Sequence, residues 1–181
     1  MSESVQSKYL TKEELDSVLK AAKRSDREYA IVLLSYRHGL RCLELLKLRW
    51  NFVDWQQKQI FISRVKGSDS GYHDLAKDEI KLLKKLKKHS QSDFIISGRE
   101  KNFSTARVRQ ICKELSLDAN LSRPFHHHML RHTCGHNMAN NPKINPLTVQ
   151  RYLGHRDSRS TEVYIREAGR EFKDLGDWWE K

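Results

Sequence analysis

The spacing of apolar residues limits the fold of this chain more than any other feature of its sequence. Thr11 and Glu14 form a capping box before an apolar helical face, so we expect a helix to begin at Lys12. A second apolar helix is expected to stop at Gly39, which suits a left-handed C-terminal position. The helices predicted beyond the first cover 27–38, 41–48, 77–89, 104–115, 128–139, 147–153 and 160–167.

One segment departs from this helical pattern. Residues 59–65 are rich in Ile, Phe and Val, residues 67–71 are typical of a turn, and residues 72–75 form a return strand. A further short strand is expected over 94–96. The predicted fold class is therefore mainly α with a small antiparallel β-hairpin or sheet.

Length and composition favour one globular domain. A folded chain of 181 residues hides about 70% of its unfolded surface, enough for one core, and no linker-like stretch interrupts it. Apolar runs such as 30–34 are far shorter than the ~20 residues that span a bilayer, and the N-terminus lacks the pattern of a secretion signal. The cysteines, Cys42, Cys112 and Cys134, suggest neither disulfides nor a zinc site. We expect a single cytoplasmic domain over 1–181.

The charge balance favours a polyanionic partner. The chain carries 34 Lys and Arg against 23 Asp and Glu, a formal net charge of +11, and such an excess attracts nucleic acid because phosphates release counterions on binding. Part of the excess lies in residues 81–88, where lysines alternate with leucines at helical spacing. That segment is more simply explained as a solvated helix face.

Two basic side chains in the first half of the chain could act on a phosphate. Arg41 and Glu44 are three residues apart, so on a helix the carboxylate can orient the guanidinium. By itself this is an ordinary helical ion pair. Lys66 ends the predicted strand, where it could reach across a cleft, although alone it resembles any surface lysine.

The second half of the chain carries another pair with the same spacing, followed by a histidine and a tyrosine. His128 and Arg131 are also three residues apart and would project from the first turn of a helix. His155 follows a Leu-Gly pair, and Tyr164 comes nine residues later. Each of these features alone is common in proteins.

Together, in this order, they resemble the catalytic domain of the tyrosine recombinase (phage integrase) family. The matching pieces are GLRxxEL at 39–45, the hairpin lysine Lys66, HxLRHT at 128–133, LGH at 153–155 and Tyr164. The resemblance runs from about residue 10 to 164. Within the family the chain is most similar to bacterial fimbrial phase-switch recombinases, through YLTKEELDSVLKAA, HHHMLRHTCG and YLGHRDSRST. As in those proteins, there is no room for an N-terminal core-binding domain before Leu10, unless a longer protein has been trimmed.

The resemblance implies that Tyr164 attacks a DNA phosphorus, giving a 3′-phosphotyrosine and a free 5′-hydroxyl. Arg41 and Arg131 would hold the phosphate, because arginine offers a planar fork of donors and keeps its charge. The bond energy stays in the protein–DNA link. Neither ATP, a metal nor any other cofactor is therefore expected.

The remaining site residues would move protons or support the arginines. His128 is suited to accept the tyrosine proton, His155 to hydrogen-bond a phosphate oxygen, and Lys66 to protonate the leaving 5′-oxygen. Glu44 would support Arg41 without reacting.

The other histidines leave alternatives open. His128, His132 and His136 recur every fourth residue, a spacing that can gather zinc ligands on one helix face. No full ligand set is present, however, so we interpret His132 and His136 as buried or partly buried helix residues. His126 and His127 either contact DNA phosphate or lie in solvent.

The resemblance also implies assembly on DNA. The expected partner is double-stranded DNA with paired recombination sites, bound by a homotetramer that is monomeric or dimeric when free, with accessory DNA-bending proteins and no membrane. Residues 10–167 form the expected catalytic core. The tail over 168–181 carries apolar residues at helical spacing and packs either on a neighbouring protomer or on its own core.

Three functions fit these features. The first is a site-specific recombinase that inverts or integrates a DNA segment, and we expect this one. The second is a DNA-binding regulator that no longer cuts, although a binder has no use for a tyrosine nucleophile. The third is a relaxing enzyme similar to type IB topoisomerases, which acts as a monomer without pairing two sites.

Overall fold

The computed structural model describes residues 8–65, 69–98, 103–155 and 159–167. Lys66 and the tail over 168–181 lie outside these ranges. The helices are α1 (Lys12–Ala22), α2 (Asp26–Arg37), α3 (Cys42–Leu46), α4 (Lys77–Lys88), α5 (Thr105–Asp118), α6 (His127–Asn140), α7 (Pro146–Leu153) and α8 (Arg159–Glu167). A 3₁₀ helix, η1 (Trp50–Phe52), and the strands β1 (Val53–Asp54), β2 (Gln59–Ile62) and β3 (Gly71–Asp74) complete the described elements. The expected fold class is confirmed.

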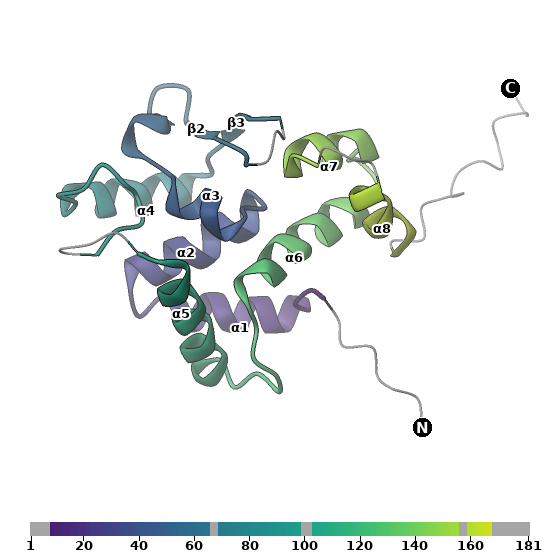
Figure 1. Ribbon diagram of the computed structural model, residues 1–181, viewed down its shortest axis with the longest axis horizontal. Helices are drawn as coiled ribbons and strands as arrows, with labels where there is room; N and C mark the ends of the chain where they lie inside the picture. Colours follow the sequence, from purple (N-terminus) through teal and green to yellow (C-terminus); the bar gives the residue numbers. More distant parts are fainter. Residues whose placement is uncertain (1–7, 66–68, 99–102, 156–158, 168–181) are drawn as a thin grey trace, which may run out of the picture.

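Helix α2 forms the centre of the molecule (Figure 1). It packs against α1, α3, α4 and α6, and its middle, from Ala30 to Ser35, is buried. Gly39 follows with a φ of 57°, which ends the helix as expected. The chain then turns directly into α3, so that this turn faces α6 and α7.

The sheet has three antiparallel strands in the order β1-β2-β3. Ile60 lies opposite Val53 on one side and His73 on the other. We did not predict β1, because a two-residue strand is too short to show alternation. The strand expected over 94–96 is wrong: Phe94 forms only an isolated bridge with Arg49. Its apolar run reflects burial of Ile95 and Ile96 in the core.

The buried side chains fall into two clusters. The larger cluster contains buried side chains from α1, α2, the sheet and α4 to α6. The smaller one lies where α6, α7 and α8 meet and consists of Cys134, Ala139, Val149, Leu153 and Tyr164. The predicted nucleophile therefore belongs to the minor cluster.

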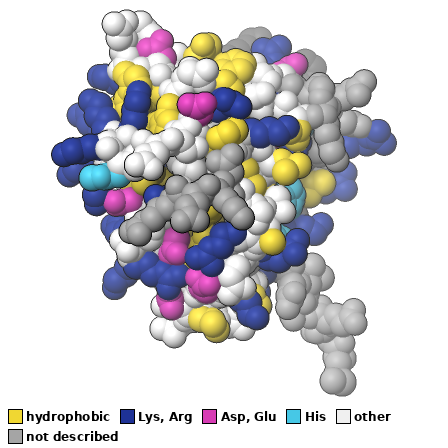
Figure 2. Space-filling view, turned by 60° about the vertical axis from the view of Figure 1, so that its left-hand side comes forward, with side chains coloured by type: hydrophobic (Ala, Val, Ile, Leu, Met, Phe, Trp, Pro, Cys, Tyr) yellow, Lys and Arg dark blue, Asp and Glu magenta, His cyan; other side chains and the backbone are white. Residues whose placement is uncertain are grey.

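Helix α4 has the amphipathic character that its sequence predicts. Leu82 and Leu83 are buried, whereas the lysines on either side of them are exposed. Figure 2 shows Lys and Arg side chains spread over this side of the molecule, with Asp and Glu among them. None of the helices in the described ranges is both long and apolar enough to cross a bilayer.

Candidate active site

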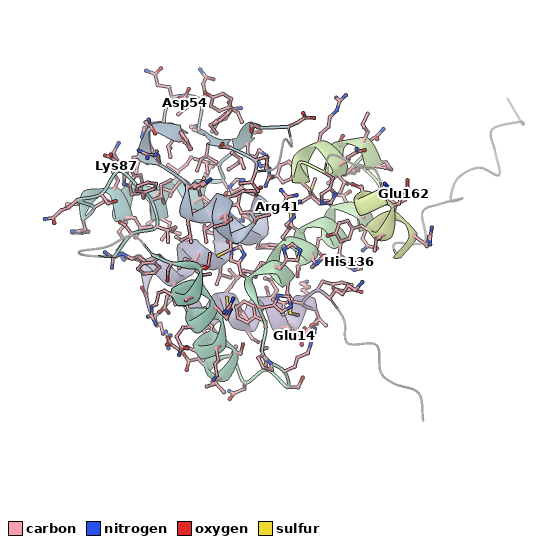
Figure 3. The ribbon with its side chains drawn as sticks, in the orientation of Figure 1. Glu14, Arg41, Asp54, Lys87, His136 and Glu162 are labelled. Carbon is pink, nitrogen blue, oxygen red and sulfur yellow. The ribbon has the colours of Figure 1, made fainter. Side chains whose placement is uncertain are left out.

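Arg41 is placed by the first turn of α3. It is the residue before the helix, and its backbone N–H donates to Oε2 of Glu44 over 2.9 Å. Its guanidinium donates to Oε1 of the same carboxylate over 2.7 Å. The side chain of Glu44 is fully buried, while that of Arg41 is 27% exposed. The carboxylate thus holds the guanidinium from beneath and leaves its outer face accessible, between α3 and α6 (Figure 3).

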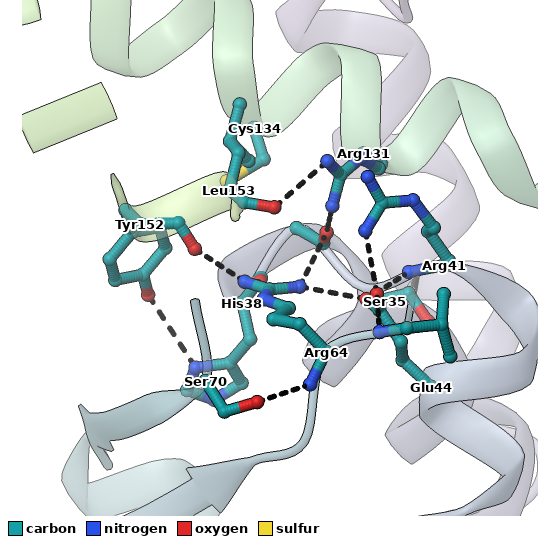
Figure 4. A network of polar contacts seen from close by, with 12 residues as sticks. Ser35, His38, Arg41, Glu44, Arg64, Ser70, Arg131, Cys134, Tyr152 and Leu153 are labelled. Carbon is teal, nitrogen blue, oxygen red and sulfur yellow. Dashed lines mark hydrogen bonds and ion pairs between the residues drawn. The ribbon is translucent and has the colours of Figure 1, made fainter. Parts of the chain in front are cut away.

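A second arginine, which sequence analysis missed, shares this carboxylate. Arg64 donates to Oε2 of Glu44 over 2.8 Å and to the carbonyl of His38 over 2.9 Å. It also donates to the carbonyls of Gly39 and Tyr152. Figure 4 shows how this one side chain joins the end of the strand to α2, α3 and α7.

The charges of this network determine the ionisation of Glu44. Burial raises the pKa of the carboxyl, but hydrogen bonds from Arg41 and the charge of Arg64 outweigh it and hold the pKa below its usual value. Burial lowers the pKa of Arg64, against the opposing effect of Glu44. Glu44 is therefore a carboxylate at neutral pH, compensated by two cations.

Arg131 reaches the same turn from α6. Its guanidinium donates to the carbonyl of Gly39 over 2.5 Å and to that of Leu153 over 2.9 Å. Burial, followed by repulsion from Arg41 and Arg64, lowers its pKa to about 10, so the side chain stays charged at neutral pH. The two carbonyls fix the plane of the guanidinium (Figure 4).

His155 is positioned by the end of α7. Gly154 closes this helix in the left-handed conformation, with φ of 64°, and a Cβ there would lie 2.9 Å from Cγ of Arg64. His155 Nδ1 lies 2.8 Å from Oγ1 of Thr161. Burial, then the charge of Arg131, lowers the pKa of His155 to about 4. The ring is therefore neutral at pH 7.

Tyr164 lies on α8 with its ring buried against α6 and α7. Its hydroxyl is 2.7 Å from Nδ1 of His132, and its ring stacks at 17° on that of His155, with 6.1 Å between centroids. His128, the second residue of α6, contacts His132 edge to face, with centroids 4.5 Å apart. Burial, then Arg131, lowers the pKa of His128.

These side chains meet in one open pocket of about 310 Å³. The structure brings together the predicted residues Arg41, His128, Arg131, His155 and Tyr164, with Glu44 beneath Arg41. Sequence analysis assigned no role in the site to four further lining residues, Lys8, Tyr9, His132 and Val163. The first two lie just before the predicted helix, where the sequence carries no signal of proximity to α6. His132 was noted for its position four residues after His128 but was interpreted only as a buried or partly buried helix residue.

Of the remaining histidines, only His127 differs from expectation. His127 is buried, so it neither lies in solvent nor is placed to contact a DNA phosphate. Its Nε2 lies 2.7 Å from the hydroxyl of Ser35. His126 is exposed, and His136 is partly buried and stacks on Tyr9 at 3.7 Å. Within the described ranges, no group of three or more potential ligands is arranged to hold a metal ion.

Comparison with known proteins identifies the family of this chain. The sequence pattern of the phage integrase family matches residues 8–171. Type 1 fimbriae regulatory protein FimB of Escherichia coli (strain K12) is 36% identical over 173 residues, covering 90% of this chain and 86% of that protein. FimE of the same strain is 32% identical over 185 residues, covering 96% and 91%.

Solved structures with a similar fold include proteins of the same kind. The crystal structure of XerA recombinase has a TM-score of 0.78 and 26% identity, covering 91% of this chain and 63% of that one. A lambda integrase dimer bound to a COC′ core site, at 20% identity, has a TM-score of 0.71 over 96% of this chain and 52% of that one. The chain thus spans roughly half to two thirds of these solved chains.

The fold and these relatives together define a site-specific tyrosine recombinase, an enzyme of DNA strand exchange. The matched pattern extends over nearly all of the chain, and the similarity to fimbrial regulators predicted from the sequence is confirmed. The chain belongs to the phage integrase family.

Proposed function

We propose that this chain cuts DNA at specific sites and rejoins it through a 3′-phosphotyrosine formed on Tyr164, inverting or integrating a segment. The observation that carries this proposal is the open pocket in which two charged arginines and neutral histidines surround the Tyr164 hydroxyl. A DNA phosphodiester resists nucleophiles because its oxygens are negative, and fixed cations offset the charge that grows at phosphorus. Arg41 and Arg131 are suited to that role.

The reaction balances with side chains of this chain. The Tyr164 oxygen bonds to phosphorus while the bond to the 5′-oxygen breaks, and a histidine takes the tyrosine proton. We assign protonation of the leaving 5′-oxygen to Lys66, and a hydrogen bond to a phosphate oxygen to His155. The reverse sequence, with the 5′-hydroxyl of another strand as nucleophile, completes strand transfer without an added energy source.

The partner that we propose is double-stranded DNA with paired sites. Among the solved relatives, XerH recombinase is recorded bound to its difH substrate. The formal net charge of +11 supports such a partner for this chain. We further propose a homotetramer on DNA, assisted by DNA-bending proteins, so that two sites are held together during exchange.

The decisive experiment uses DNA captured by the protein itself. Fragments that become covalently attached are sequenced, and the recovered site is placed twice, in inverted orientation, on a supercoiled plasmid. Inversion supports the proposal. Relaxation of any plasmid without inversion would indicate a topoisomerase-like enzyme, and binding without an adduct would indicate a regulator. The matched control is Tyr164→Phe, which should bind equally well and form no adduct.

Assembly is tested separately by deleting residues 171–181, which lie outside the described structure. If this tail contacts a neighbouring protomer, its loss should reduce cooperative binding to two adjacent half-sites and reduce recombination. Binding to one half-site should change little. A gel-shift titration on one and two half-sites measures both. Noncooperative binding that the deletion leaves unchanged would contradict the proposed assembly.

A further inference from the structure

The contact between Tyr164 and His132 is built from two packed helices. The hydroxyl and Nδ1 are 2.7 Å apart, on α8 and α6 respectively, and these helices pack against each other. The tyrosine is only 5% exposed. Its ring fits because Gly135 has no side chain, since a Cβ there would lie 2.8 Å from Cε2 of Tyr164. The hydroxyl is therefore directed at His132 by the packing of its own ring.

His132 is in the protonation state that this contact requires. Burial, followed by the charges of neighbouring groups, lowers its pKa to about 4, so the imidazole is neutral at pH 7. In the tautomer with a proton on Nε2, Nδ1 offers a lone pair to the tyrosine O–H. The groups that act on its charge are His128 and Arg131 on α6, Lys8 and His126 before helices, His155 after α7, and Tyr164 on α8.

We propose that His132 is the catalytic residue that accepts the proton of Tyr164 as its oxygen attacks phosphorus. This inference rests on the proposed function and differs from the role that family resemblance suggests for His128. In the forward step the tyrosine O–H proton moves to Nδ1, the oxygen–phosphorus bond forms, and the 5′-oxygen leaves with a proton from another donor. In rejoining, the same proton returns to the tyrosine oxygen.

Binding of DNA would strengthen this base. Arg131 and Lys8 lower the pKa of His132 by repelling a second positive charge, and a phosphate held between them and Arg41 adds a compensating negative charge. The basicity of His132 therefore rises when the scissile phosphate is in place. Tyrosine activation is thus linked to occupation of the site.

The test separates the hydrogen bond from the proton transfer. His132→Asn places an amide oxygen close to the position of Nδ1, so it can still accept a hydrogen bond from Tyr164 but cannot take its proton. His132→Leu removes both. His136→Asn, one turn further along α6, is the matched control. Adduct formation is timed in single turnover on a nicked form of the recovered site, at saturating protein, from pH 6 to pH 9.

At pH 7 we expect His132→Asn to slow cleavage by about 10²–10⁴-fold, the range of general base catalysis, and His136→Asn by less than about threefold. The wild-type rate should be flat between pH 7 and pH 9. The His132→Asn rate should rise about tenfold per pH unit, because solution hydroxide must then remove the proton. Binding to the half-site should be unchanged in both variants.

A modified substrate locates the defect at the nucleophile. With sulfur in place of the bridging 5′-oxygen, the leaving group needs no proton, so a Lys66→Ala defect is relieved whereas the His132→Asn defect persists. The inference would be overturned if His132→Asn cleaved DNA at the wild-type rate and with the wild-type pH profile. It would also be overturned if the sulfur substrate relieved the His132→Asn defect, or if His132→Leu cleaved faster than His132→Asn. A wild-type protein that forms no adduct would instead refute the proposed function.

Discussion

At the scale of single residues, the sequence predicts the Arg41–Glu44 pair but not the arginine that completes it. Ile60, Ile62 and Arg64 alternate along one strand and its extension, and all are buried. The period of two therefore carried a signal that Arg64 points inward. Its partners were not predictable, because the carbonyls of His38 and Tyr152 lie 26 and 88 residues away in sequence. Local spacing identifies pairs within one helix, whereas such a network depends on tertiary packing.

The first prediction concerns Arg131, whose guanidinium spans the carbonyls of Gly39 and Leu153. Arg131→Lys keeps the charge, but a single ammonium cannot hold both carbonyls and also present a planar fork to phosphate. We expect cleavage to fall by about 10²–10³-fold, the usual effect of losing a donor to transition-state charge. Affinity for a half-site should fall much less. Single-turnover cleavage and gel shifts measure the two, and cleavage within a few-fold of wild type would exclude Arg131 from the scissile phosphate.

At the scale of elements, the helical pattern predicted each described α-helix, with ends displaced by up to about three residues. The errors lie where the pattern is short: β1 and η1 were missed, and residues 94–96 are not a strand. Helix α6 shows why the site was largely predictable. Arg131 and His132 follow His128 by three and four residues, and Gly135 follows them by four and three, so all four lie on one side of that helix. Only the identity of the side chain that faces the Tyr164 hydroxyl could not be predicted, because it depends on how α8 packs against α6.

Gly135 yields the second prediction. Gly135→Ala favours the helix by up to about 1 kcal/mol in propensity, but the new methyl group would overlap the Tyr164 ring. We expect α6 to persist while the tyrosine moves away from His132, so that adduct formation falls at least tenfold. Circular dichroism and half-site binding serve as controls. An unchanged cleavage rate would mean that α8 shifts as a body without displacing the hydroxyl.

At the scale of the whole molecule, buried neutral histidines make stability depend on pH. Burial lowers the pKa of His127 to about 4 and that of His73 to about 3, from the usual 6.5 of a histidine. The unfolded chain therefore binds protons more readily than the folded one below pH 6.5. The stabilisation is complete above that value and is lost as the pH falls toward the folded-state pKa.

The third prediction follows from this loss of stability at low pH. The free energy of unfolding should decrease as the pH falls from 7 to 5, with His127 contributing up to about 1.4 kcal/mol per pH unit. His127→Gln should be less stable at pH 7, because its bond to Ser35 is disturbed, and should lose less stability on acidification. Urea unfolding at several pH values measures this. Identical slopes in both proteins would show that other groups cause the acid sensitivity.

The division of buried side chains into two clusters has a consequence for motion. Tyr164 belongs with Val149 and Leu153 in the small cluster at the end of α6, and elements with few buried apolar contacts open at lower free energy than the main core. In hydrogen–deuterium exchange, amides of α8 should therefore exchange well before those of α2, while the protein remains globally folded. Equal protection of the two helices would contradict this. Tyr164 would thus lie on a helix that opens separately from the main core, so it could move away from the arginines while they stay in place.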